Sequence, residues 1–156
     1  MQGVTRKLAE FAAQTRYEQL PAEVVRESKR LLLDTIGCAV GAVYTDSGGI
    51  ALKHVRALGG NPIATIMGTG ERTSPVNAAY ANARLANVLD ADDTFPTGSH
   101  FGSTTVFSAL ALAEQQKRTG RDLIAAIAVG FDVGARIGSS LGLSITVEDG
   151  KVTGYA

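Results

Sequence analysis

The sequence predicts an all-α protein, a helical bundle of five or six helices with one minor strand. Small side chains are abundant and bulky ones are few, with 18 Gly, 6% aromatic residues and no Trp, and small side chains let helices pack closely. Apolar residues also recur at helical spacing along most of the chain. Pro62–Gly68 is the one short run with the composition of a strand bounded by turn residues.

Helix-start and helix-stop residues bound the predicted elements. Pro21 and Pro75 suit the first position of a helix. Ser74 and Ser103 are expected to be N-caps, and Gly120 ends a helix. In chain order, the expected helices span Val4–Tyr17, Pro21–Ala39, Ser47–Leu58, Pro75–Leu89, Thr104–Arg118 and Asp122–Leu141. The tail Gly142–Ala156 is rich in Gly and Thr, with a turn at Gly150-Lys151.

Two glycine pairs are expected to let helices approach each other closely. Gly37 and Gly41 lie one turn apart on the second helix, and Gly130 and Gly134 do so on the last. Cys38 lies among small apolar residues, so we expect an inert, buried thiol.

Composition excludes several classes of protein. With 15 basic and 15 acidic residues the net charge is zero, which argues against nucleic-acid and membrane partners. One cysteine excludes an internal disulfide framework. No continuous apolar run approaches the roughly 18 residues of a spanning helix, and the N-terminus lacks a signal-peptide core. We therefore expect a cytoplasmic protein with residues 1–156 forming one helical domain, itself incomplete.

The loop Asp90–Gly102 holds the residues best suited to chemistry. Asp90, Asp92 and Asp93 place three carboxylates within four positions after a helix C-terminus, where mutual repulsion and the helix dipole both disfavour negative charge. His100 follows, and imidazole is the side chain suited to proton transfer near neutral pH. The pattern predicts that His100 transfers a proton and that Asp90 orients it.

The residues after His100 begin a helix, so unpaired backbone N–H groups and the Ser103 hydroxyl point back towards the loop. Such a helix end can bind a ligand carboxylate or phosphate. The combination suits proton chemistry on a small acidic metabolite. His54, by contrast, lies mid-helix beside basic residues and is expected to be an ordinary surface side chain.

Other interpretations of the loop remain open. It could be a solvated acidic turn. Val88–Thr94 also fits an apolar-D-x-D-x-T phosphatase motif, with Asp90 as nucleophile and Asp92 as acid/base, although the preceding segment is helical where that motif needs a strand. Asp90, Asp92, Asp93 and His100 could together ligate a divalent metal, but spacing alone is weakly specific. The loop could also belong to a cofactor-free lyase.

Four segments of the sequence form a recognisable pattern: Leu20–Ala42, Asn77–Thr94, Ser99–Ser103 and Ser108–Gly138. The pattern covers nearly the whole chain in order, and its Asp-x-Asp-Asp-Thr loop followed by His at this spacing is fairly specific. These segments resemble the MmgE/PrpD family, which includes 2-methylcitrate dehydratase, cis-aconitate decarboxylase and iminodisuccinate epimerase.

The resemblance implies a large helical domain, a later α/β domain, homodimers, no metal or organic cofactor, and a di- or tricarboxylate substrate bound between the domains. Asp90, Thr94 and His100 match residues that line the family's substrate pocket, with His100 the candidate for proton transfer. Thr94 and the helix end at Ser103 would bind a substrate carboxylate. Asp92 matches the middle of the motif, as Asp93 does, and is expected to be structural.

The chain also departs from the family pattern. Phe101 stands where the family often has proline, and Ala156 stands where a second histidine is expected. The family's substrate-binding lysines and a tyrosine fall beyond residue 156. We therefore expect the N-terminal part of a lyase or epimerase acting on a small carboxylate such as 2-methylcitrate, inactive by itself. The alternative is a non-catalytic helical oligomerisation module or a degenerate paralogue.

Overall fold

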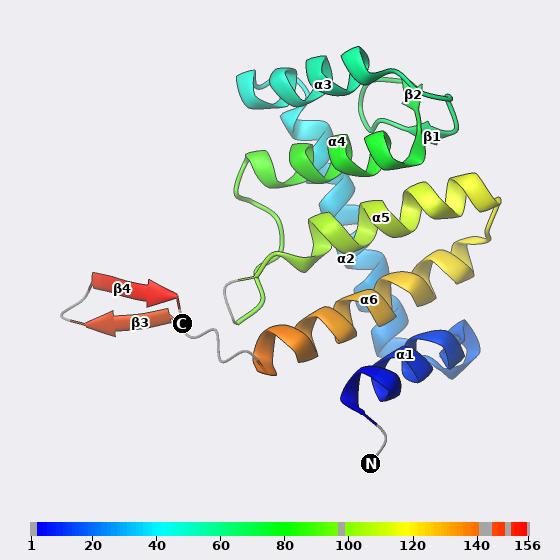
Figure 1. Cartoon of the computed structure of the whole chain (residues 1–156), viewed down its shortest axis with the longest axis vertical. Coiled ribbons are helices and arrows are strands. Elements are labelled where there is room, and N and C mark those ends of the chain that lie inside the picture. Colours follow the sequence, from blue (N-terminus) through cyan, green and yellow to red (C-terminus); the bar gives the residue numbers. More distant parts are fainter. Residues whose placement is uncertain (1–2, 97–98, 141–144, 149–150, 156) are drawn as a thin grey trace.

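A computed structural model describes residues 3–96, 99–140, 145–148 and 151–155, and six α-helices dominate this part of the chain (Figure 1). The all-α prediction is therefore confirmed. The helices are α1 Val4–Gln14, α2 Ala22–Ala42, α3 Asp46–Leu58, α4 Pro75–Val88, α5 Phe101–Gln116 and α6 Gly120–Ser140, with a 3₁₀ turn, η1, at Tyr17–Gln19.

The core forms where α2 crosses a stack of helices. In Figure 1, α3, α4, α5 and α6 lie one beside the next, and α2 runs behind them, in contact with α4, α5 and α6. Ala39 of α2, Leu85 of α4, Phe107 of α5 and Ile127 of α6 are fully buried in one apolar cluster. The small alanine surfaces allow these helices to approach closely around the few large side chains.

Local capping starts two of the helices. The Ser74 hydroxyl accepts the Asn77 N–H at 3.4 Å, with Pro75 at the first position of α4, so the predicted N-cap is confirmed. The Thr45 hydroxyl accepts the Gly48 N–H at 3.0 Å and starts α3. These contacts satisfy N–H groups that a helix N-terminus leaves unpaired.

The start of α5 differs from the prediction. Ser103 is not the N-cap, because α5 begins at Phe101 and His100 occupies the N-cap position. Ser103 lies buried in the first turn, and its hydroxyl donates to the His100 carbonyl oxygen at 3.5 Å. The helix can begin this early because the Gly102 N–H is taken by Asp93, which lies in the preceding loop.

The predicted strand is short and braced by buried side chains. Within Pro62–Gly68, only β1 (Ala64–Thr65) is a strand, paired antiparallel with β2 (Arg72–Thr73). Asn82 of α4 donates to the Thr65 carbonyl oxygen at 2.8 Å and accepts the Met67 N–H at 2.8 Å.

A second antiparallel pair lies after α6 and was not predicted. It joins β3 (Ile145–Glu148) to β4 (Lys151–Tyr155), with a register shift between Thr146 and Val147. Residues 149–150 and 156 lie outside the described residues. They include Gly150 of the predicted turn and Ala156, which was expected to stand in place of a histidine.

The second glycine pair makes the close helix contact that was expected of it. A Cβ at Gly130 would lie 2.6 Å from Thr105 Cγ2, and one at Gly134 would lie 3.0 Å from Phe101 Cδ1, both on α5. Gly37 behaves differently, because a Cβ built there meets nothing within 4 Å. The prediction of a close approach is therefore wrong for Gly37.

By length and composition α6 could cross a membrane, with 21 residues and a mean hydropathy of 1.4. The helix still contains no continuous apolar run of about 18 residues, as expected, because Asp132 and Arg136 interrupt its apolar residues. It contacts α5, α2 and α1, and Asp132 and Arg136 form an ion pair at 2.8 Å on its surface. A core helix of a bundle has the same properties.

Two Gly→Ala substitutions test this packing. Gly37→Ala should raise the free energy of unfolding by about 0.5–1 kcal/mol, because alanine favours helix and meets no obstacle. Gly130→Ala should lower it by about 1–3 kcal/mol, because the new methyl group overpacks against the stiff Thr105 side chain. Urea denaturation measures both, and equal shifts would contradict the α5–α6 contact.

Candidate functional site

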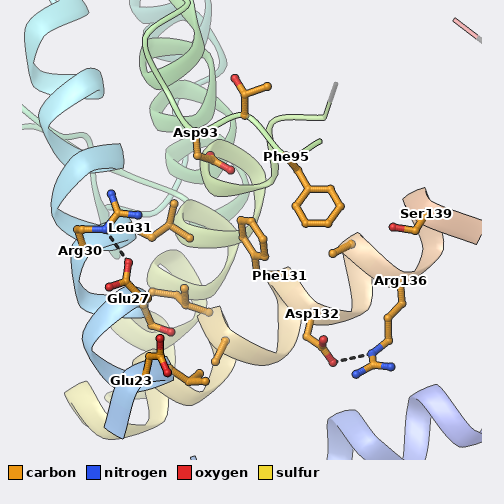
Figure 2. A pocket seen from close by; sticks show the side chains of 16 residues that line it. Glu23, Glu27, Arg30, Leu31, Asp93, Phe95, Phe131, Asp132, Arg136 and Ser139 are labelled. Atoms are coloured by element: carbon orange, nitrogen blue, oxygen red, sulfur yellow. Dashed lines mark hydrogen bonds and ion pairs between the residues drawn. The ribbon is translucent and has the colours of Figure 1, made fainter. Parts of the chain in front are cut away.

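The loop between α4 and α5 is held against the bundle by aromatic contacts. The Phe95 N–H donates to the Ser99 carbonyl oxygen at 2.8 Å. The Phe95 ring packs 5.7 Å from Phe101 of α5 and 6.0 Å from Phe131 of α6, between ring centroids. Figure 2 shows the rings of Phe95 and Phe131 next to each other, one from the loop and one from α6. The loop is thereby held against the start of α5 and the middle of α6.

Asp92 and His100 form the central contact of the loop. The Asp92 side chain is fully buried, and its Oδ1 lies 3.1 Å from Nδ1 of His100. The Asn87 amide lies 3.4 and 3.5 Å from the two Asp92 oxygens. A carboxylate that accepts the Nδ1–H of a histidine fixes the ring and leaves Nε2 free to exchange a proton. The His100 side chain is 29% exposed, so the ring is partly open to solvent.

Asp90, predicted to orient His100, is placed differently. It is exposed and has φ of 50° directly after α4, a left-handed conformation that aspartate tolerates better than most residues. Its carboxylate lies within 4.8 Å of ligand atoms of Asp92 and His100, but the hydrogen bond to His100 Nδ1 comes from Asp92. The buried carboxylate expected to be structural thus orients the imidazole, and any role of Asp90 in the reaction stays a prediction.

The same three side chains have the spacing of a metal site. One ligand atom each from Asp90, Asp92 and His100 lies within 4.8 Å of the others, as an oxygen- and nitrogen-bound divalent cation would require. The Asp92 oxygens are already bonded to Asn87 and His100. No other feature of the described residues points to a cation, and the expectation that the protein uses no metal stays a prediction.

Asp93 caps α5 from the loop. Its Oδ1 accepts the Gly102 N–H at 2.7 Å, and its Oδ2 is buried with no partner in the part of the chain that the structure describes. Burial raises the pKa of Asp93, and the neighbouring Asp92 carboxylate adds to this, while the Gly102 N–H opposes it. A Cβ at Gly102 would lie 2.2 Å from Asp93 Oδ1. This cap therefore requires glycine at position 102.

Thr94 and Ser103, the predicted substrate-binding residues, have different exposure. Thr94 is exposed and lines a cleft of about 940 Å³. Ser103 is buried, with its hydroxyl directed to the His100 carbonyl oxygen. Thr94 is therefore open to a ligand, whereas Ser103 stabilises the first turn of α5. Substrate binding by either residue stays a prediction.

The cleft lies between α2, α6 and the loop (Figure 2). Both of its basic side chains are paired: Arg30 with Glu27 at 2.7 Å, and Arg136 with Asp132 at 2.8 Å. Both guanidinium groups are thereby partly neutralised at the cleft wall. Apolar lining is supplied by Val24, Leu31, Phe95, Ile127, Ala128, Phe131 and Ala135.

His54 and Cys38 take no part in the loop contacts. His54 is exposed on α3, with its ring 5.8 Å from that of Tyr80, so its predicted surface position is confirmed. Cys38 is partly buried. Burial raises the pKa of the Cys38 thiol, and the nearby carboxylates of Asp34 and Asp92 raise it further. A thiol that resists ionisation is a poor nucleophile, as expected for an inert side chain.

Comparisons with known proteins identify the family of this chain and several relatives. Residues 6–151 match the family model described as the MmgE/PrpD N-terminal domain. Cis-aconitate decarboxylase of Aspergillus terreus is 32% identical over 149 residues, covering 89% of this chain and 30% of the relative. Human cis-aconitate decarboxylase is 28% identical over 142 residues, covering 88% of this chain and 30% of the relative. A cis-aconitate decarboxylase-like protein, oryM, of Aspergillus oryzae is 27% identical over 146 residues, with coverages of 88% and 30%. The chain thus spans about 30% of the length of these relatives.

The half-buried Asp93 predicts a specific pH dependence of stability. Because its folded-state pKa lies above the ordinary 3.8, the folded state holds this proton more tightly than the unfolded state. The free energy of unfolding should therefore fall as pH rises from about 3.8 through the raised pKa. Asp93→Asn removes this contribution, so the stability of the wild type relative to this variant should decrease across that range in urea titrations.

Asp122→Asn is the matched control, because Asp122 also caps a helix but is exposed. Hydrogen bonds from Thr119 lower the pKa of Asp122 below 3.8. The ionised Asp122 therefore adds to the free energy of unfolding above about pH 3.8, and this contribution is lost as pH falls through the lowered pKa. The same sign for both variants would contradict the burial of Asp93.

Proposed function

This chain belongs to the MmgE/PrpD family, and we propose that it supplies the N-terminal part of the active site of a cofactor-free lyase. The proposal rests on the buried Asp92 that holds Nδ1 of the half-exposed His100. This arrangement is suited to moving a proton at Nε2, and the exposed Asp90 carboxylate is a second proton-transfer group beside it.

The proposed substrate is a small di- or tricarboxylate. The relatives named cis-aconitate decarboxylase favour decarboxylation of a substrate of that kind. Dehydration of a compound such as 2-methylcitrate and epimerisation are the alternatives. All three reactions need a proton moved to or from a carbon beside a carboxylate, so the same histidine serves each of them.

For decarboxylation, the C–C bond to one carboxylate breaks and carbon dioxide leaves. The electron pair of that bond stays on the substrate, where a carbon takes up a proton. We propose that protonated His100 donates this proton from Nε2, while its Nδ1–H stays hydrogen-bonded to the Asp92 carboxylate. The neutral ring then regains a proton from solvent. The exposed Thr94 hydroxyl would donate a hydrogen bond to a remaining substrate carboxylate.

The positive charge that a polycarboxylate requires comes, in this proposal, from outside the loop. The sequence has no Lys or Arg between Arg84 and Lys117, and the chain spans about 30% of the relatives' length. We propose that a part equivalent to the remaining length completes the pocket, in the same polypeptide or in a second one. A homodimer in the cytoplasm, with no nucleic-acid or membrane partner, is part of this proposal.

In a complete enzyme that carries these residues, His100→Ala should lower the rate of turnover by about 10²–10⁴-fold, because the proton donor is lost. His54→Ala is the matched control and should leave turnover unchanged, since His54 is exposed on α3. Release of carbon dioxide from cis-aconitate measures both. Equal activity of the two variants would exclude His100 as the proton donor.

Residues 1–156 by themselves should give negligible turnover of cis-aconitate or 2-methylcitrate, because the pocket lacks cations from the rest of the family fold. Purified chain and a carbon dioxide or dehydration assay test this directly. Robust turnover would show that the site is already complete. If the chain restored no activity when joined to the missing part, the alternative of a non-catalytic helical module would be favoured.

A further inference from the structure

The His100 side chain could either cap the start of α5 or bind Asp92. It occupies the N-cap position, yet its side chain makes no capping hydrogen bond. N-cap side chains commonly accept an N–H of the first turn, because those groups have no partner within the helix. Here the imidazole instead faces the buried Asp92. Another group must therefore satisfy the first turn of α5.

Asp93 supplies that group. Its Oδ1 accepts the Gly102 N–H at 2.7 Å, and a carboxylate at a helix N-terminus is also favoured by the helix dipole. The absence of a side chain at Gly102 allows the approach, and a Cβ there would also meet Leu31 and Thr35 of α2 at 3.0 Å. The cap is thus enclosed between the loop, α5 and α2.

We propose that Asp93 is a positioning residue for His100. By capping α5 from the loop, it replaces the capping function of the N-cap residue and leaves the imidazole available to Asp92. Asp92 and Asp93 are consecutive in the chain. Asp92 is hydrogen-bonded to the His100 side chain, and Asp93 accepts the backbone N–H of Gly102, two residues further on. Its importance for catalysis rests on the proposed function, whereas the positioning itself does not.

Without the Asp93 carboxylate, His100 should become the capping residue of α5 and lose its hydrogen bond to Asp92. The Gly102 N–H would lose its acceptor. We expect the unprotonated Nδ1 of His100 to accept it, because His100 holds the N-cap position and N-cap side chains commonly accept an N–H of the first turn. An imidazole that accepts at Nδ1 carries its proton on Nε2. The Asp93→Ala variant should therefore shift neutral His100 from the Nδ1–H tautomer towards the Nε2–H tautomer.

Nitrogen-15 NMR of the imidazoles tests the proposal on the full chain without substrate. The sequence has only two histidines, and His54 is an exposed internal reference. Wild-type His100 should show the Nδ1–H tautomer. Asp93→Ala should shift most of the population to Nε2–H and raise the exchange rate of the Gly102 amide at least tenfold. Asp93→Asn retains an acceptor oxygen, so most His100 side chains in this variant should keep the Nδ1–H tautomer of the wild type.

Asp122→Ala is the control for a lost helix cap. Asp122 accepts the Thr119 N–H at 3.0 Å next to the start of α6, so its loss should destabilise the chain without changing His100. The proposal is overturned if Asp93→Ala exposes the Gly102 amide but keeps the Nδ1–H tautomer, or if Asp122→Ala shifts the tautomer equally. If Asp93→Ala does not fold, Asp93→Glu displaces the carboxylate and should give the same shift; an unchanged tautomer there also overturns the proposal.

The experiments can contradict the proposed function and the proposed positioning role of Asp93 independently. An inactive complete enzyme with a wild-type His100 tautomer would count against the proposed function alone. An active enzyme whose tautomer does not depend on Asp93 would count against the positioning alone.

Discussion

The structure depends on placing two consecutive acidic side chains, Asp92 and Asp93, against the protein interior. Burying a carboxylate is costly unless donors replace the lost water. The donors are the imidazole of His100, the amide of Asn87 and the backbone N–H of Gly102. All three lie at the facing ends of α4 and α5. The hydrogen bonds from these donors hold the loop against the start of α5 and place His100, although Asp93 Oδ2 has no partner among the described residues.

Helix packing supports the same junction from the other side. Phe101, the first residue of α5, packs 5.6 Å from Phe131 of α6, between ring centroids, and lies against Gly134. A larger residue at Gly134 would push α6 away from the ring. The small residues of α6 are therefore connected to the site through packing, because they decide where the first turn of α5 lies.

The local parts of this arrangement could be predicted from the sequence, and the long-range parts could not. Helical periodicity, the Ser74 cap and the importance of the acidic loop follow from residues close together in the chain. Which aspartate reaches His100 depends on the left-handed turn at Asp90, which sets where the following side chains point. Ser103 was predicted as a cap because the sequence does not show that Asp93 already satisfies the first turn.

The charge of the loop indicates what kind of partner surface would complete a pocket. Two like charges 4 Å apart repel by about 4 kcal/mol at an effective dielectric of about 20. A di- or tricarboxylate beside Asp90, Asp92 and Asp93 would therefore be repelled unless cations lie on its far side. Arg30 and Arg136 at the cleft are paired with Glu27 and Asp132, and the sequence has no Lys or Arg between Arg84 and Lys117. Under the proposed function, the groups that transfer the proton and the groups that neutralise the substrate therefore come from different parts of the fold. An active site of that kind would form only where the two parts meet, because the part with the carboxylates would repel the substrate by itself.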